Sequence, residues 1–301
     1  MLRKNTEYLP EQIQGISMID METEHQIAYE QGFALYEVRE DYVIRDDRLW
    51  PEGEIKYKYA PMLHPELPGE IAKLTWGDHK ALLRFTRRYG QLGYSFVVEE
   101  ALHRNPSAED PIWRERLSEY KGEPLRWIWG HASTINICLT LTSLLQEGNE
   151  AALQSYLYTL RGPVSLGWEV QPNLDSSTEA LEDGCFIPFP ELGIIESAKW
   201  FRRNTVNRNI GPVRRGIHDV DGKGEKSYYS VRGTVRAAYW HLATLIETGQ
   251  YRLVRCKDPK CRAWFAQRDP RQRFCPAQGG MKESRCSARY RMRARRADQR
   301  E

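Results

Sequence analysis

The sequence lacks the features that mark membrane proteins and several large enzyme classes. No window approaches the roughly 18 consecutive apolar residues that a transmembrane helix needs. The first residues, Met-Leu-Arg-Lys-Asn-Thr-Glu, include no apolar stretch of the kind that forms a signal peptide. Walker-type loops, G-x-G-x-x-G, G-x-S-x-G and H-E-x-x-H are also missing. We therefore expect a cytoplasmic protein without membrane contact, and the sequence supplies no catalytic residue and no site for an organic cofactor.

Cysteines are few and unevenly placed. The chain has 301 residues and 6 cysteines, of which Cys138 and Cys185 stand alone and the others lie in residues 251–301. Cys138 occurs in the apolar run Ile-Asn-Ile-Cys-Leu-Thr-Leu, where we expect it to act as a small core hydrophobe. In a reducing cytosol, clustered cysteines favour metal binding over disulfides. The C-terminal cysteines are therefore the first candidates for a chemical role.

Acidic residues are scarce at the C-terminal end. The formal net charge is only +3, but residues 251–301 carry 16 Lys+Arg and 5 Asp+Glu, a net +11. The remainder carries 28 basic and 36 acidic residues, a net −8. This separation concentrates positive potential at one end of an otherwise acidic protein.

The hydrophobic pattern predicts a mainly α-helical body with minor β structure over residues 1–250, joined directly to a small module over residues 251–301. Alternating apolar residues indicate two short strands and a β-hairpin near residues 33–45, and the proline-rich stretch 61–68 is expected to be a loop. Asp78 is expected to cap a helix. Further helices are expected at about 124–146, 149–161, 193–204 and 228–248, with a polar turn over 219–225. The first of these is nearly all apolar and should be central in the core.

Four cysteines in the module have the spacing C-x4-C-x13-C-x10-C, formed by Cys256, Cys261, Cys275 and Cys286. Four thiolates make a soft, tetrahedral ligand set, and zinc is the ion that such a set usually holds. Because four protein ligands leave no open position for water, the expected Zn2+ is structural. The metal would supply much of the folding free energy of so small a module.

The segments between the cysteines suggest a local fold. Cys256 and Cys261 should flank a tight turn at Asp258-Pro259. Residues 262–266 and 272–275 are expected to pair as a hairpin with its tip at Asp269-Pro270. Trp264, Phe265 and Phe274 would cover the small core, and Cys286 would lie in the first turn of a final helix. A knuckle, a hairpin and a helix in this order describe a treble-clef-type zinc fold.

The expected final helix is dense in arginine. Spacings of 4, 4, 3 and 4 residues place one continuous stripe on it, formed by Arg285, Arg289, Arg293, Arg296 and Arg300, and Arg291 and Arg295 widen the basic side. Tyr290, Ala294 and Ala297 form a neighbouring apolar stripe that would pack on the hairpin. With almost no acid between them, the arginines repel one another, whereas phosphates would stabilise the helix. Guanidiniums suit bidentate contacts to phosphate or guanine, so these seven arginines are the candidate nucleic-acid contacts. The alternative is a solvated basic tail.

This C-terminal pattern resembles the CGNR-type zinc finger, which occurs at the C-terminus of uncharacterised bacterial proteins and of proteins assigned as transcription regulators. The resemblance covers residues 251–297, where the four cysteines stand at the ligand positions of the family and Arg289 at its final arginine. The Cys-Gly-Asn-Arg of the family is here Cys286-Ser-Ala-Arg289, and the interval from Cys275 to Cys286 is longer. The resemblance implies a zinc-dependent, DNA-binding transcriptional regulator whose helical body senses a ligand or mediates assembly.

Two other chemistries are disfavoured by the residues themselves. A nuclease of the HNH type needs a histidine at the hairpin, but the last histidine is His241. A calcium loop starting at Asp219 would place Ser230 at its twelfth position, where Glu is required.

Several hypotheses about the function remain open. DNA is favoured over RNA as the partner. The module could instead be an adaptor whose arginines meet an acidic protein, or the body could be an enzyme of unrecognised type. A homo-oligomer is compatible with either.

Overall fold

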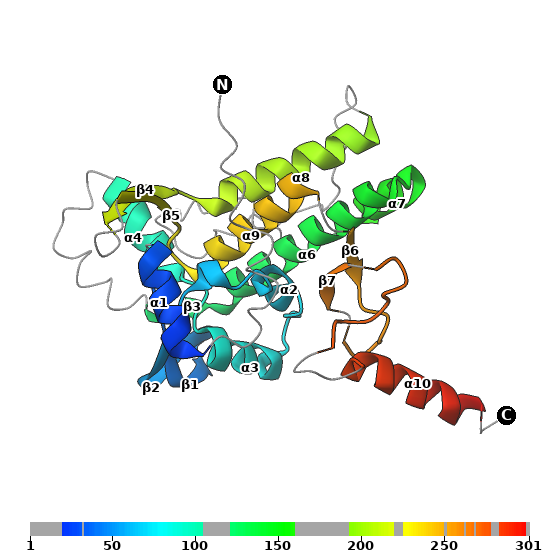
Figure 1. The fold of residues 1–301 in the computed structure, drawn as a ribbon, viewed down its shortest axis with the longest axis horizontal. Helices are drawn as coiled ribbons and strands as arrows, with labels where there is room; N and C mark the ends of the chain where they lie inside the picture. Colours follow the sequence, from blue (N-terminus) through cyan, green and yellow to red (C-terminus); the bar gives the residue numbers. More distant parts are fainter. Residues whose placement is uncertain are drawn as a thin grey trace.

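The computed structural model describes residues 20–31, 33–104, 121–159, 193–219, 225–249, 252–261, 263–267, 269–277 and 283–298, and these form a mainly α-helical protein with minor antiparallel β structure, as expected (Figure 1). The helices are α1 Met21–Gln31, the 3-10 helix η2 Pro61–Leu63, α2 Leu67–Ile71, α3 His79–Tyr89, α4 Tyr94–Arg104, α6 Leu125–Glu147, α7 Glu150–Thr159, α8 Ile194–Ile210, α9 Thr234–Thr248 and α10 Arg285–Asp298. The strands are β1 Tyr36–Arg45, β2 Arg48–Tyr59, β3 Glu123–Pro124, β4 Arg214–Asp219, β5 Glu225–Ser230, β6 Arg252–Arg255 and β7 Trp264–Gln267. Among the described residues, no helix combines the length and the apolar character that a membrane crossing requires.

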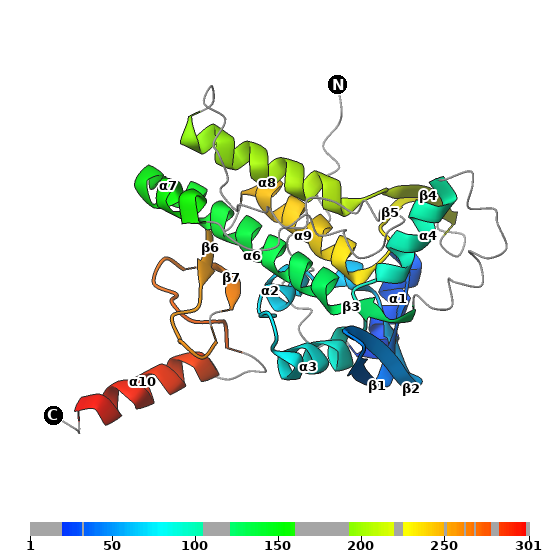
Figure 2. The same ribbon diagram turned by 180° about the vertical axis from the view of Figure 1, so that it is seen from behind.

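Helix α6 is the centre of the body, which confirms its predicted position. It packs against α2, α7, α8 and α9, and the long helices α6, α8 and α9 run alongside one another in both views (Figures 1 and 2). Its buried side chains include Trp127, Ile128, Ile135 and Leu139. Most of its side chains are buried, and the partly exposed stripe of Ser133, Asn136 and Thr140 is polar, as expected for a helix covered on most of its sides.

The β-hairpin expected near residues 33–45 lies further along the chain. Residues 36–45 form the single strand β1, and its antiparallel partner is β2. The two strands are joined by Asp46 and Asp47, which both have positive φ, of 51° and 53°. Consecutive residues of this conformation form the tight turn that matches the twist of a two-residue hairpin, and aspartate tolerates it better than most residues. The prediction placed the turn inside β1 because it overlooked this pair.

Other elements also differ from the prediction. The stretch 61–68, expected as a loop, contains η2 and the start of α2, with Pro61 and Pro68 in first turns, where proline is tolerated. Helix α8 continues to Ile210 rather than ending near 204. The helix expected from residue 228 begins only at Thr234, because residues 225–230 form β5, paired with β4. The polar turn of residues 220–224 lies outside the described residues.

Gly233 separates β5 from α9. Its φ is +100°, and a Cβ there would lie only 3.3 Å from the backbone oxygen of Leu92. Both the conformation and the close approach exclude a side chain. The chain can therefore turn from strand to helix against the segment that precedes α4, which explains why α9 begins later than its hydrophobic periodicity suggests.

The C-terminal segment is docked on α6. The Trp264 indole donates a hydrogen bond to Asn136 Oδ1 (3.0 Å), and the Leu253 backbone N–H donates to Gln146 Oε1 (2.8 Å). Leu253 is buried in the main core, and Trp264 packs against that core. The division at residues 250 and 251 stays a prediction. In the structure, these two side chains of the expected module belong to the packing of the body.

A partly buried histidine connects α1 to the rest of the body. His64 lies between Glu24 of α1 and Glu66, at 3.3 and 3.0 Å from their carboxylate oxygens. Tyr89 donates a further hydrogen bond to Glu66. Burial alone would lower the pKa of His64, but the two carboxylates outweigh it and raise the pKa to about 9. A charged imidazolium therefore bridges two acidic side chains from different elements.

The stability of the protein should depend on pH through His64. Its pKa is about 9 when folded and 6.5 ordinarily, so the folded state binds more protons than the unfolded state between these values. The free energy of unfolding should therefore fall as pH rises through this window, by about 1 kcal/mol per pH unit at most. In the His64→Gln variant, urea unfolding across this range should show a smaller slope. An unchanged slope in that variant would contradict the assignment.

Candidate metal centre and basic helix

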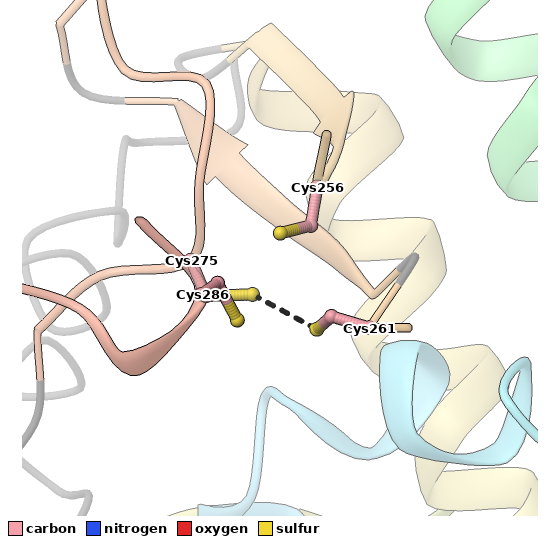
Figure 3. Close-up of side chains that lie close together, drawn as sticks. All are labelled: Cys256, Cys261, Cys275 and Cys286. Carbon is pink, nitrogen blue, oxygen red and sulfur yellow. Dashed lines mark hydrogen bonds between the residues drawn. The ribbon is translucent and has the colours of Figure 1, made fainter. Parts of the chain in front are cut away.

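Four cysteine side chains from separate segments converge on one point (Figure 3). Cys256 directly follows β6, Cys261 lies in the turn before β7, Cys275 follows β7, and Cys286 lies in the first turn of α10. Their Sγ atoms all lie within 4.8 Å of one another, and those of Cys261 and Cys275 are 3.6 Å apart. The predicted grouping of these four residues is therefore confirmed.

The geometry fits a tetrahedral metal ion. A tetrahedron with metal–sulfur bonds of about 2.3 Å has sulfur–sulfur edges of about 3.8 Å, close to the separations found here. Cys256 and Cys286 are buried and pack with Phe265, while Phe274 lies partly buried beside them. The cluster could therefore hold a metal ion in a largely covered position. Among the described residues it is the one group of this kind.

Backbone hydrogen bonds shape the knuckle, by which we mean residues 256–261. The Cys261 N–H donates to the Asp258 carbonyl (2.9 Å), which closes the predicted turn at Asp258-Pro259. The Cys256 N–H donates to the Ala263 carbonyl (2.8 Å), so the two ends of the knuckle are held together. These bonds place the Cys256 and Cys261 side chains on the same side of the turn, as two ligands of one ion require.

The hairpin of the module differs from the prediction. Strand β7 pairs with β6, in the register Arg252 with Gln267 and Arg255 with Trp264, and the knuckle is the connection between the two strands. Residues 272–275 were expected to be the partner strand, but they form no strand. Phe265 and Phe274 contribute to the small core as expected, whereas Trp264 faces α6. The chain therefore enters the module through a strand that is already anchored on the body.

The sulfur atoms influence one another's protonation. Burial and the neighbouring Cys261 thiolate raise the pKa of Cys275 and that of Cys286, the latter to about 11. Burial acts in the same direction on Cys261, but hydrogen bonds from the Ala263 backbone and from the other thiols outweigh it and lower its pKa. One thiolate thus opposes the ionisation of its neighbours. A cation among them removes this repulsion, because coordination deprotonates thiols.

Asp258 is the residue that the sequence analysis missed. Its side chain is fully buried beside the cysteines, and it binds two arginines of α10. Arg289 Nε donates to Oδ2 (2.8 Å) and Arg293 Nη1 donates to Oδ1 (3.1 Å). Burial alone would raise the pKa of Asp258, but the hydrogen bond and charge of Arg289, with the charge of Arg293, outweigh it and hold the pKa below its ordinary value. Arg289 also donates to Cys286 Sγ (3.4 Å).

Some arginines of α10 therefore have acidic partners within the protein. Its first two turns face the knuckle through Arg289 and Arg293, and Arg291 pairs with Glu283 on another side of the helix. Other arginines of the candidate interface are exposed and form no ion pair with a described residue: Arg285, Arg295 and Arg296. Arg300 lies outside the described residues.

Only the N-terminal part of helix α10 contacts the other segments of the module; the rest of the helix extends away from them. Tyr290 packs on Phe274 with ring centroids 5.2 Å apart, but it is 45% exposed. Ala294, expected to continue the packed stripe, is exposed. The side chain of Ala297 is not among those described. Figures 1 and 2 show the second half of the helix projecting beyond the rest of the protein. The expected apolar stripe is therefore reduced to one aromatic contact.

The comparisons with known proteins add no relationship. No family model matches the chain, and neither the curated proteins nor the solved structures yield a match. The resemblance to the CGNR-type finger therefore remains an expectation from the cysteine spacing. A function for the chain has to be argued from the geometry of the cysteines and the charges around them.

Asp258 should control the order of α10. Replacing it by Asn removes the charge that Arg289 and Arg293 bind, and a hydrogen bond to a charged group contributes about 1.5 kcal/mol or more. We expect amide hydrogen exchange in residues 285–293 to accelerate roughly tenfold or more, the factor that corresponds to about 1.4 kcal/mol. Asp269→Asn, at an exposed turn of the same module, is the matched control. Equal exchange in both variants would contradict the role of Asp258.

Proposed function

We propose that this chain is a zinc-dependent nucleic-acid-binding protein in which the C-terminal module presents α10 to a phosphate backbone. One observation carries the proposal: four Sγ atoms lie within 4.8 Å of one another at the base of a helix whose exposed side chains are mostly arginines. The cysteines account for how so small a module is held together. The arginines account for what it binds.

Zinc is the ion that suits the cluster best. All four candidate ligands are cysteine sulfurs, which favours zinc over the hard cations magnesium and calcium, and four such ligands suit its preferred tetrahedral coordination. Four cysteines leave no coordination position for water, so the metal would act on structure and not on a substrate. Because Cys286 belongs to the first turn of α10, the metal would also fix where the helix starts and the direction in which it leaves the module.

Duplex DNA is the favoured partner. The projecting part of α10 carries Arg295 and Arg296, which are exposed and form no ion pair with a described residue. The major groove of B-form DNA admits an α-helix, whereas the major groove of A-form RNA is too narrow for side chains to read. Arginines on such a helix contact phosphates, and one or two of them can reach base edges. Together with the resemblance to the CGNR-type finger, this supports a transcriptional regulator whose helical body senses a ligand or mediates assembly.

The metal assignment can be checked by counting zinc. Cys256→Ser and Cys286→Ser should each lower the zinc content from one per chain to well below one half, because a hydroxyl is a poor ligand for this ion. Most of the helical circular dichroism should remain, since the body has its own core. Cys138→Ala, which removes a buried cysteine of α6, should retain one zinc per chain. Full zinc in both ligand variants would exclude the site.

The nucleic-acid assignment can be checked by fluorescence anisotropy with labelled duplex DNA and single-stranded RNA at several salt concentrations. The zinc-loaded protein should bind the duplex in the micromolar range or tighter at low salt. Changing Arg285, Arg295 and Arg296 to Ala should reduce the slope of log affinity against log salt concentration by about 2 to 3, since each neutralised phosphate contributes about 0.9 to that slope. Absence of binding to both nucleic acids at low salt would contradict the proposed function.

A further inference from the structure

We infer that the knuckle itself, and not only α10, is a nucleic-acid phosphate-binding surface, formed by Lys257, Lys260 and Arg273 together with Arg289 and Arg293. This inference rests on the proposed function and extends it to residues outside the helix. Its basis is that the Arg289 and Arg293 side chains bind the buried carboxylate of Asp258, while backbone contacts bring Lys257, Lys260 and Arg273 to the same turn.

Backbone and side-chain contacts bring the five residues together. The Lys260 N–H donates to Asp258 Oδ1 (3.2 Å), the same oxygen that accepts from Arg293. Lys257 directly precedes Asp258, and its N–H donates to the Arg273 carbonyl (2.9 Å). The loop after β7 and the first turns of α10 therefore meet at the knuckle, although they are separate in sequence.

The charges at this surface do not cancel. The Arg289 and Arg293 side chains bind Asp258, and backbone contacts bring Lys257, Lys260 and Arg273 to the same knuckle, so these six residues carry a formal net charge of +4. Lys257, Lys260 and Arg273 are exposed, and the side chains of Arg289 and Arg293 remain 47% and 36% exposed although they bind Asp258. The other acidic residues of the described module are Asp269, in the turn after β7, Glu283, which is paired with Arg291, and Asp298, at the far end of α10.

Asp258 also holds two of the cations in place before any ligand arrives. A guanidinium has five N–H donors, so Arg289 and Arg293 keep donors beyond those that Asp258 accepts. Because the buried carboxylate restricts their side chains, less conformational entropy is lost when a phosphate binds to the remaining donors. A buried acid beneath exposed arginines is thus compatible with anion binding and favours it.

The chemistry of the surface favours phosphates over an acidic protein. The cores of protein–protein interfaces are enriched in aromatic and other apolar side chains and depleted in lysine. Among the described residues of the module, the large hydrophobic side chains classed as exposed are Tyr290 and Met292 on α10, and the knuckle has none. A surface in which lysines and arginines outnumber exposed apolar side chains matches a partner recognised by its charge, which is the sequence-independent part of nucleic-acid binding.

The experiment compares two triple variants of the full-length, zinc-loaded chain. The first changes Lys257, Lys260 and Arg273 to Ala. The second, the matched control, removes three exposed cationic residues from the body: Lys56, Arg84 and Arg203. Binding to labelled duplex DNA is measured by anisotropy over a range of salt concentrations, and zinc content is measured on each protein. The knuckle variant should retain its zinc and weaken its binding, with a log–log salt slope reduced by about 2 to 3, whereas the control keeps the slope of the unmodified protein.

The outcomes separate the two proposals. If the unmodified protein binds and the knuckle variant keeps the same slope, the inference is wrong and the proposed function stands. If the unmodified protein binds no nucleic acid at low salt, the proposed function is wrong, and the inference that rests on it is wrong as well. If polyglutamate displaces the DNA at an equal concentration of charge, the surface suits an acidic protein and the inference is overturned. A reduced slope only in the knuckle variant, with polyglutamate ineffective, supports it.

Discussion

The convergence of four cysteine sulfurs is the constraint on which the rest of the C-terminal module depends. The module has a two-stranded hairpin, a turn, a loop and the start of a helix, but only Phe265 and Phe274 as large hydrophobic residues around the cluster. So little apolar surface cannot offset the conformational entropy of ordering these segments. The four sulfurs therefore lie where a larger domain would have its hydrophobic core. The start of α10 is brought to this point by Cys286, which lies in its first turn.

The body contributes to the module in a different way. Strand β6 is anchored on α6 by a backbone hydrogen bond to Gln146, and β7 by the Trp264 indole on Asn136. An ion pair between Arg252 and Glu147 lies beside these contacts. The module is thus attached to α6 through two adjacent strands. The base of the hairpin and helix α6 are therefore in direct contact.

Sequence reasoning succeeded where the signal is local and failed where it depends on distant partners. Helix α6 was predicted because its residues are apolar on every side, and the four cysteines because their spacing is unusual. The pairing of β6 with β7 was missed because the Asp269-Pro270 turn suggested residues 272–275 as a nearer partner strand. Asp258 was read as a turn residue, which it is. Its second role could not be seen, because Arg289 and Arg293 lie 31 and 35 residues further along the chain.

The position of Cys286 has a consequence for the order in which the protein is assembled during synthesis. This last sulfur is contributed by the first turn of α10, after the other three have already been made. The surface of α6 that receives Leu253 and Trp264 ends at residue 147 and is complete much earlier. Domains generally fold as units from the N-terminal side during translation. In the nascent chain, the surface of α6 that contacts β6 and β7 would therefore be complete before Cys286, the fourth cysteine of the cluster, has been synthesised.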